Sequence, residues 1–271
     1  MDYQHIKVEP LTPTIGATIH GVDLSRPLDD LTFDEIHHAW MEHLVVFFRD
    51  QKLTPEQHLE FGRRFGPLHI HPAAPYVHDN PELMQIHTDR HSQRNNGAGW
   101  HSDVSADEEP PLGSILHLHQ VPAKGGDTLF ANMYAAYEAL SGPMRNWLTD
   151  LQAVHRADYA GLYGDHKPQR AFPQSTHPVI RAHPVTARKA LYVNSGFTRR
   201  IEGLTAAESR GLLQFLFEHI RNPAFQCRFQ WQQNSIAMWD NRCTQHLAVW
   251  DYFPDTRSGI RVTVKGDRPF C

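Results

Sequence analysis

The segment GWHSDVS, residues 99 to 105, places His101 two residues before Asp103. In a β-strand, residues i and i+2 point to the same side, so an imidazole nitrogen and a carboxylate oxygen there can converge on one cation. The chain contains 20 histidines, so pairs of this kind also arise by chance. The alternative interpretation is a histidine hydrogen-bonded to a nearby acid.

A second histidine, His246, strengthens the metal hypothesis. It follows an apolar, strand-like segment and a turn in the sequence MWDNRCTQHLAVW, 238–250. Two histidines and one carboxylate on one face of an octahedral ion leave three positions open, which is typical of non-haem Fe(II) oxygenases. A zinc hydrolase is the competing interpretation, although the HExxH arrangement is not evident. The same ligand types tolerate Mn or Co, so the residues predict a metal site without fixing the metal.

Two arginines, Arg257 and Arg261, follow His246 and are four residues apart. In a strand this even spacing puts both side chains on one side, where they can face one cavity. Two inward guanidinium groups are costly without anions to pair with. The pair therefore predicts a bidentate carboxylate or another oxyanion as ligand.

Composition excludes several classes of protein. The 271 residues are 40% hydrophobic and 21% charged, with a formal net charge of −4, so one large or two small globular domains are expected without a basic surface for nucleic acid. No apolar run approaches the roughly 18 residues of a membrane span, and the N-terminus lacks a secretory pattern. The three cysteines, Cys227, Cys243 and Cys271, form no CxxC pair. A cytoplasmic location is expected.

Capping boxes predict three helix starts, at Thr32 with Glu35, Thr54 with Gln57, and Thr205 with Glu208. A fourth helix is predicted over 133–151, with Gly142-Pro143 as the point where it divides.

Strands are predicted at 43–48, 113–121, 190–197, 227–231, 235–240 and 260–266. Strands and helices do not alternate regularly and no GxGxxG motif or P-loop is present, which disfavours a Rossmann-type sheet. We expect a mainly β fold with flanking helices.

Ordered motifs along nearly the whole chain resemble the taurine dioxygenase family (TauD/TfdA) of Fe(II)- and 2-oxoglutarate-dependent dioxygenases. The motifs include IGATIHGVDLSRPL (15–28), RRFGPLHIHP (63–72), WHSDVS (100–105), PPLGSILHLHQVPAKGGDTLF (110–130) and WDNRCTQHLAVWDY (239–252). The resemblance implies a single domain over 1–271 with a double-stranded β-helix (jelly-roll, cupin-like) core. It also implies Fe(II), 2-oxoglutarate and O₂, a small anionic substrate, and a homo-dimer or tetramer.

The resemblance also assigns roles to residues. His101, Asp103 and His246 would be the iron ligands, and Arg257, helped by Thr128, would meet the distal carboxylate of 2-oxoglutarate.

On the substrate side, Arg261 and His71 match positions that contact the sulfonate in taurine-cleaving members, and Phe197 and Val104 would line the pocket. The amine end of the taurine site is not matched, because Ala74 stands at the place of an aromatic residue and Gly97 at the place of an asparagine. The implied substrate is therefore another anion: an alkyl or aryl sulfonate, a sulfate ester, or a carboxylate.

Two other functions remain open on the sequence. One is a 2-oxoglutarate oxygenase acting on a carboxylate, such as an aryloxyalkanoate or a biosynthetic acid; the other is a non-catalytic, metal-binding cupin-like module. Asp240 and Asn241 are predicted to be turn or supporting residues rather than ligands, and segments 71–99 and 158–175 are predicted pocket covers.

Overall fold

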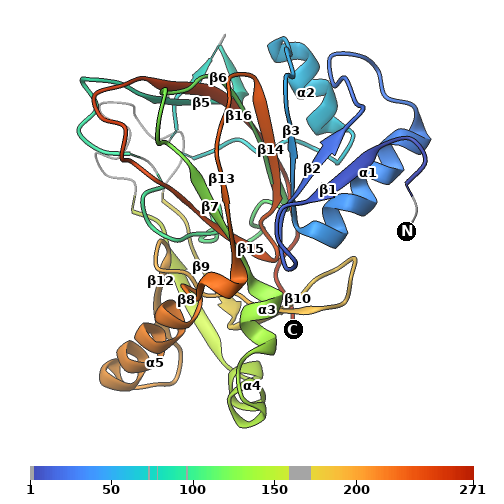
Figure 1. Cartoon of the computed structure of the whole chain (residues 1–271). Helices are drawn as coiled ribbons and strands as arrows, with labels where there is room; N and C mark the ends of the chain where they lie inside the picture. The colour runs from blue at the N-terminus through green and yellow to red at the C-terminus, as the bar shows by residue number, and fades with distance from the viewer. Residues whose placement is uncertain (1–2, 73, 78, 96, 159–171) are drawn as a thin grey trace.

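The chain folds mainly into β-strands, with several helices around them (Figure 1). The computed structural model describes residues 3–72, 74–77, 79–95, 97–158 and 172–271. Within these residues the largest sheet has eight strands in the order β1 (Lys7–Pro10), β2 (Ala17–His20), β3 (Val45–Phe48), β14 (Ser235–Asp240), β6 (Gly113–Gln120), β16 (Arg257–Val264), β5 (Asn80–Thr88) and β4 (Tyr76–Val77).

Smaller sheets and five α-helices complete the described part. The sheets are β13 (Gln226–Phe229), β7 (Thr128–Asn132) and β15 (Thr244–Ala248); β12 (Thr198–Ile201), β8 (Gln152–Arg156) and β9 (Gln174–Pro178); and β10 (Ile180–Ala182) with β11 (Lys189–Leu191). The helices are α1 (Asp30–His43), α2 (Pro55–Arg63), α3 (Met133–Glu138), α4 (Gly142–Thr149) and α5 (Ala206–His219), and a 3₁₀ turn covers Pro223–Phe225.

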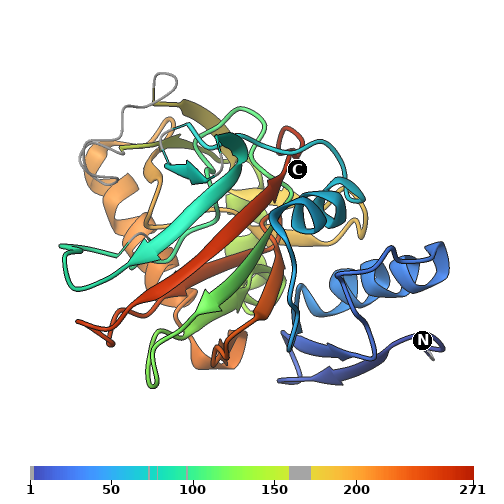
Figure 2. The ribbon, with the colours of Figure 1, turned by 90° about the horizontal axis from the view of Figure 1, so that it is seen from above.

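The eight-stranded sheet is buried on both faces at its centre. Along β14, Trp239 points into the main core, where it meets Phe130 of β7. The alternate residue Met238 points to the other face, into a second core that includes Trp40 of α1. This period of two places the sheet between the β13–β7–β15 sheet and the helices α1 and α2. Figures 1 and 2 show α1 and α2 beside the large sheet, and Figure 1 shows α3, α4 and α5 at the opposite end from α2.

Two of the three predicted capping boxes are confirmed, at Thr54 and Thr205. The predicted division of the fourth helix is also confirmed, because α4 begins after Ser141 as a new N-cap with Pro143 in its first turn. No helix in the described ranges is long and apolar enough to cross a lipid bilayer.

The box predicted at Thr32 is wrong. Helix α1 begins three residues earlier, with Asp29 as N-cap, whose carboxylate accepts the backbone N–H of Thr32 at 2.9 Å. Glu35 does not complete a box there; it accepts backbone N–H groups of the N-terminal segment, including that of His5 at 2.9 Å. A stronger capping residue one turn upstream therefore displaced the expected start.

Among the strands, 113–121 and 235–240 match β6 and β14 closely. The segment predicted at 190–197 is a strand only to Leu191, and Asn194 to Phe197 form a turn in which the Asn194 side chain accepts the Phe197 N–H at 2.9 Å. β5 and β7 were not predicted. β5 pairs with β16 and so places residues of 80–88 beside the two arginines.

Candidate active site

The two candidate histidine ligands face each other across an antiparallel bridge. The backbone N–H of His101 donates to the carbonyl of His246 at 3.1 Å, and the reverse bond is 2.8 Å long. The Nδ1 atom of His101 lies 2.8 Å from the carbonyl oxygen of Gly99, which fixes the ring proton on Nδ1 and leaves Nε2 as a metal-binding atom. The ring centroids of the two histidines are 4.1 Å apart.

Asp103 completes the cluster from the same short segment. Its Oδ1 lies 3.8 Å from Nε2 of His101 and 3.9 Å from Nε2 of His246. Metal bonds of about 2.1 Å at right angles separate donor atoms by about 3 Å, so a modest closing of these side chains brings all three onto one ion. The prediction that His101 and Asp103 share one face of a regular strand is wrong. Only His101 makes a bridge, and Asp103 begins a turn in which Val104 has a positive φ of 47°.

The charges of the three groups suit a divalent cation. Burial raises the pKa of the Asp103 carboxyl, but Arg261 and the two imidazoles outweigh burial and hold that pKa well below its ordinary value. Burial lowers the pKa of both His101 and His246. The cluster therefore offers one carboxylate and two neutral imidazoles at neutral pH, the protonation states that metal binding requires.

Arg257 and Arg261 both project into the same pocket, as their spacing on β16 predicts. Arg261 donates to Oδ1 of Asp103 at 2.7 Å, while its Nε is buried and has no hydrogen-bond partner in the part of the chain that the structure describes. Arg257 donates through Nε to the carbonyl of Gly126 at 3.1 Å. Burial lowers the pKa of Arg257 to about 10, so this guanidinium stays charged at pH 7. No carboxylate of the described residues lies within ion-pair distance of it.

Thr128 lies beside Arg257 with its hydroxyl oriented by two donors. Trp231 donates from Nε1 to Oγ1 at 3.0 Å, and an NH₂ group of Arg257 is 3.5 Å from the same atom. With both lone pairs approached by donors, the hydroxyl proton is directed to an acceptor elsewhere. Thr128, Trp231 and Arg257 together form a donor-rich corner that suits a carboxylate.

His71 also lines the pocket. Its Nδ1 accepts the backbone N–H of Ala74 at 2.9 Å, so the neutral ring carries its proton on Nε2. The structure brings all nine predicted residues to the lining of one pocket: His71, His101, Asp103, Val104, Thr128, Phe197, His246, Arg257 and Arg261.

Sequence reasoning missed several lining residues, among them Met84, Ile86, Trp231 and Ala248. Met84 pairs with Arg261 across β5 and β16, a register that could have been found only by identifying β5. Trp231 follows β13, and no local motif links it to Thr128, 103 residues away. The predicted cover 158–175 lies mostly outside the described residues, since 159–171 are not among them, and the cover at 71–99 stays a prediction.

Comparisons with known proteins point to one family. The family model "Taurine catabolism dioxygenase TauD, TfdA family" matches residues 7–263. An "Alpha-ketoglutarate-dependent sulfate ester dioxygenase" of Pseudomonas putida is 38% identical over 97% of this chain and 91% of its own length. A "Putative alpha-ketoglutarate-dependent sulfonate dioxygenase" of Schizosaccharomyces pombe is 36% identical over 97% of this chain and 70% of its own length. The crystal structure of a "Putative Alpha-ketoglutarate-dependent Taurine Dioxygenase" from Burkholderia xenovorans matches with a TM-score of 0.88 at 40% identity, over 97% of this chain and 94% of that chain.

Proposed function

This chain belongs to the TauD, TfdA family of alpha-ketoglutarate-dependent dioxygenases, and we propose that it hydroxylates a small sulfonate or sulfate ester with an apolar body. The observation that carries the proposal is the meeting, in one pocket, of the cluster formed by His101, Asp103 and His246 with two buried arginines on one strand. Family membership argues against a non-catalytic metal-binding module. The two-sheet packing around the pocket supports a double-stranded β-helix as the core.

In this proposal His101, Asp103 and His246 hold Fe(II), and Arg257 with Thr128 binds the distal carboxylate of alpha-ketoglutarate (2-oxoglutarate). When bound, the iron and the keto acid supply the oxidising chemistry, with O₂ consumed and the keto acid converted to succinate and CO₂. The protein residues bind and orient the reactants, which is the larger part of their contribution to such reactions.

Arg261 and His71 bind the anionic group of the substrate. The Nε of Arg261, which has no partner among the described residues, and the Nε2–H of His71 are two donors at the lining of the pocket. Between them the lining is largely apolar, from Met84, Ile86 and Phe197. This division orients the substrate with its anion fixed and one carbon directed to the metal.

Oxidation of the carbon that carries the anion explains how the substrate is cleaved. A hydroxyl group on the carbon bound to sulfur, or to the ester oxygen, gives an unstable product. That product expels sulfite from a sulfonate or sulfate from a sulfate ester and leaves an aldehyde. By the resemblance to taurine-cleaving members, the small, buried Ala74 stands at the place of the aromatic residue that meets the amine, so taurine is a poor candidate.

A screen of anionic substrates tests the proposal. The purified protein with Fe(II), alpha-ketoglutarate and O₂ should release succinate in step with an alkyl sulfate or alkyl sulfonate, with aldehyde and sulfate or sulfite formed in equal amount. The variants His101→Ala and Asp103→Ala should lose this release, while His38→Ala, exposed and away from the pocket lining, should keep it. Retained turnover in either ligand variant would refute the metal assignment.

A carboxylate substrate is the second candidate, because a guanidinium binds planar carboxylates in a bidentate way as well as it binds sulfonates. An aryloxyalkanoate or a biosynthetic acid that released succinate faster than any alkyl sulfate would favour this candidate. The same metal and alpha-ketoglutarate residues would serve it.

A further inference from the structure

The two oxygens of the Asp103 carboxylate have different neighbours. Oδ1 faces the two imidazoles and also accepts a hydrogen bond from Arg261. Oδ2 is turned away and accepts a hydrogen bond from the hydroxyl of Ser114 at 2.8 Å. Both Asp103 and Ser114 are buried, so this bond is shielded from water.

Ser114 is a polar residue in an otherwise apolar part of β6. It lies opposite Trp239 on β14 and opposite Thr263 on β16, in the interior of the large sheet, and it has no exposed surface. A buried hydroxyl in such a strand needs partners to offset its desolvation. Its partners are Asp103, the side-chain amide of Asn241 at 3.3 Å and, at the limit of hydrogen-bond distance, the hydroxyl of Thr263 at 3.5 Å.

The hydrogen-bond network fixes which way the Asn241 amide points. Its Oδ1 lies 3.0 Å from the indole Nε1 of Trp239 and 3.3 Å from the backbone nitrogen of Asp103, and both of these groups can only donate. The Nδ2 group must therefore donate to Ser114. Oδ2 of Asp103 can only accept and lies 2.8 Å from the Ser114 hydroxyl, against 3.5 Å for the hydroxyl of Thr263, so the single proton of Ser114 is directed to Asp103.

We infer that Ser114 and Asn241 are positioning residues for Asp103, which direct one hydroxyl proton onto Oδ2 and so keep Oδ1 turned to the metal as a single donor atom. Without this bond Arg261 holds the carboxylate through Oδ1 alone, and the group can turn about its last side-chain torsion or use both oxygens. The inference rests on the proposed metal centre and adds to it the residues that set the coordination mode of its carboxylate.

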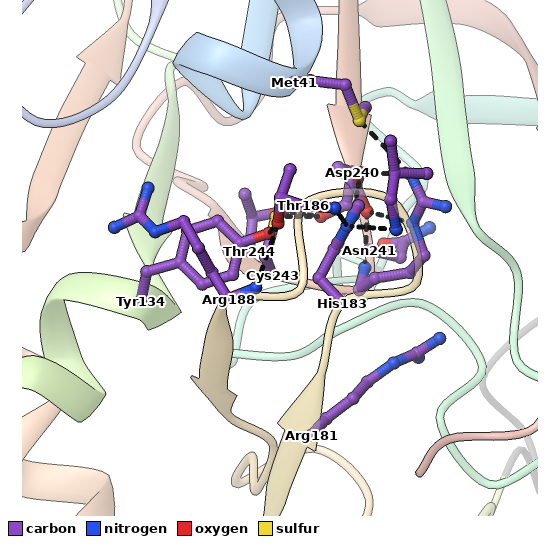
Figure 3. A network of polar contacts seen from close by, with 12 residues as sticks. Met41, Tyr134, Arg181, His183, Thr186, Arg188, Asp240, Asn241, Cys243 and Thr244 are labelled. Carbon is purple, nitrogen blue, oxygen red and sulfur yellow. Dashed lines mark hydrogen bonds and ion pairs between the residues drawn. The ribbon is translucent and has the colours of Figure 1, made fainter. Parts of the chain in front are cut away.

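The turn that carries Asn241 is built around Asp240 (Figure 3). The Asp240 carboxylate accepts the backbone N–H and Nε of Arg242 on Oδ1, both at 2.9 Å, and an NH₂ group of Arg242 at 2.6 Å on Oδ2. His183 accepts the backbone N–H of Thr186 on Nδ1, so its Nε2–H donates to Oδ2 of Asp240 at 2.9 Å.

His183, Asp240 and Cys243 lie close enough to hold a metal ion, but this second cluster is already satisfied. Four donors from Arg242 and His183 occupy both oxygens of the Asp240 carboxylate, and the proton on Nε2 of His183 is already directed to it. The cluster therefore fixes a turn. The backbone of Asn241 is held in addition by Ser102, whose hydroxyl donates to its carbonyl at 2.6 Å. Asn241 thus contacts both Ser102, through its backbone carbonyl, and Asp103, through its side-chain amide.

The test compares Ser114→Ala with Thr263→Val, which removes a buried hydroxyl on the neighbouring strand, 3.5 Å from Ser114, without touching Asp103. The readouts are the Kd for Mn(II), measured from the electron paramagnetic resonance signal of the free ion, and the visible spectrum of the Co(II) protein. Ser114→Ala should weaken Mn(II) binding about 10- to 100-fold and shift the Co(II) bands. In other metalloproteins, removal of a residue that hydrogen-bonds a metal ligand lowers metal affinity by this factor. Thr263→Val should leave both unchanged.

The same substitution in a protein that already carries Asn241→Ala is a second test. In Asn241→Ala, Mn(II) binding should already be weak, and adding Ser114→Ala should cost less than it does in the wild type, because the two residues act in one chain. Far-UV circular dichroism and thermal midpoints establish that each variant is folded; if Asn241→Ala does not fold, the comparison of Ser114→Ala with Thr263→Val decides alone.

Two results overturn the inference, and they are distinguishable. If the wild type binds Mn(II), Asp103→Ala does not, and Ser114→Ala matches the wild type in both readouts, the positioning role is refuted and the proposed centre stands. If Asp103→Ala binds Mn(II) as well as the wild type, the proposed centre fails and the inference fails with it.

Discussion

Arg257 shows how a single buried side chain defines what it will bind. Its guanidinium is held by the carbonyl of Gly126 and lies over the ring of Trp231, with 5.4 Å between the Cζ atom and the ring centroid. Burial lowers its pKa to about 10, which still leaves it protonated below pH 9. A fixed, planar cation without a carboxylate partner in the described residues suits a carboxylate that arrives as ligand.

We therefore expect Arg257→Lys to weaken alpha-ketoglutarate binding although the charge is kept. A lysine replaces a planar fork by a point charge, and losing one charged hydrogen bond costs about 1.5–3 kcal/mol, or about 10- to 100-fold in Kd. Isothermal titration of the Mn(II) protein with alpha-ketoglutarate measures this directly. Arg261→Lys is the matched control, since it should affect the keto acid less and the primary substrate more. Equal loss of keto-acid affinity in both variants would show that the two arginines are wrongly assigned.

The turn from Asn194 to Phe197 is the element that packs against the backbone of Trp100 and His101. The backbone N–H of Gly196 donates to the carbonyl of Trp100 at 3.1 Å, and the Ser195 hydroxyl donates to the same oxygen at 3.0 Å. A Cβ atom on Gly196 would lie only 2.8 Å from the Cβ of His101. The absence of a side chain at 196 thus allows this turn to approach the segment that carries His101 and Asp103, while Phe197 reaches the pocket.

Gly196→Ala should consequently displace His101 and lower both Mn(II) affinity and turnover by at least about tenfold, because small misplacements of ligands are costly. The contact is with a Cβ atom next to the backbone and cannot be relieved by a rotamer change. Gly211→Ala, on helix α5 with no atom within 4 Å of the new methyl group, is the control. It should leave metal binding intact and raise the free energy of unfolding by up to about 1 kcal/mol. Wild-type Mn(II) binding in Gly196→Ala would show that the turn is more compliant than its contacts indicate.

Elements with a strong local signal were predictable, and those defined by distant partners were not. The boxes at Thr54 and Thr205 and the strand 235–240 were found because caps and apolar runs are local. The convergence of the metal cluster was found through residue types, although the local geometry of Asp103 was mistaken. A turn with a positive φ at Val104 gives the same convergence as the expected strand.

Trp231 and the chain from Asn241 through Ser114 to Asp103 could not be derived from spacing. Trp231 and Thr128 are 103 residues apart, and Asn241 and Ser114 are 127 apart, and the pairing of β7 with β13 and of β6 with β14 brings them together. Sequence pattern indicates which face of a strand is buried, but not which strand lies beside it. The roles of the pocket residues therefore needed the sheet order as well as the motifs.

At the scale of the whole molecule, several of the 20 histidines are packed into the fold as neutral groups. Burial lowers the pKa of His58 to about 3, of His155 to about 3 and of His117 to about 4. His58 is held in the interior between α2 and β6, where Nε2 donates to the carbonyl of Ile115 at 3.1 Å. Protonating any of these rings places a charge in an apolar interior, so the folded state resists it.

This burial predicts a stability that falls steeply in mild acid. In the unfolded chain a histidine has a pKa near 6.5, so between pH 6.5 and about 4 the unfolded state binds more protons than the folded state. Each such histidine then removes about 1.4 kcal/mol of unfolding free energy per pH unit as the pH falls. Above pH 6.5 the ring is neutral in both states and this loss is absent.

Urea unfolding of the metal-free protein at pH 7.5, 6.0, 5.0 and 4.5 measures the slope. His58→Gln keeps a donor for Ile115 but cannot titrate, so its slope below pH 6.5 should be shallower by about 1.4 kcal/mol per pH unit, whatever its absolute stability. Gly211→Ala, which neither adds nor removes a titratable group, should keep the wild-type slope. A wild-type slope in His58→Gln would mean that His58 is already protonated or solvated in the folded protein.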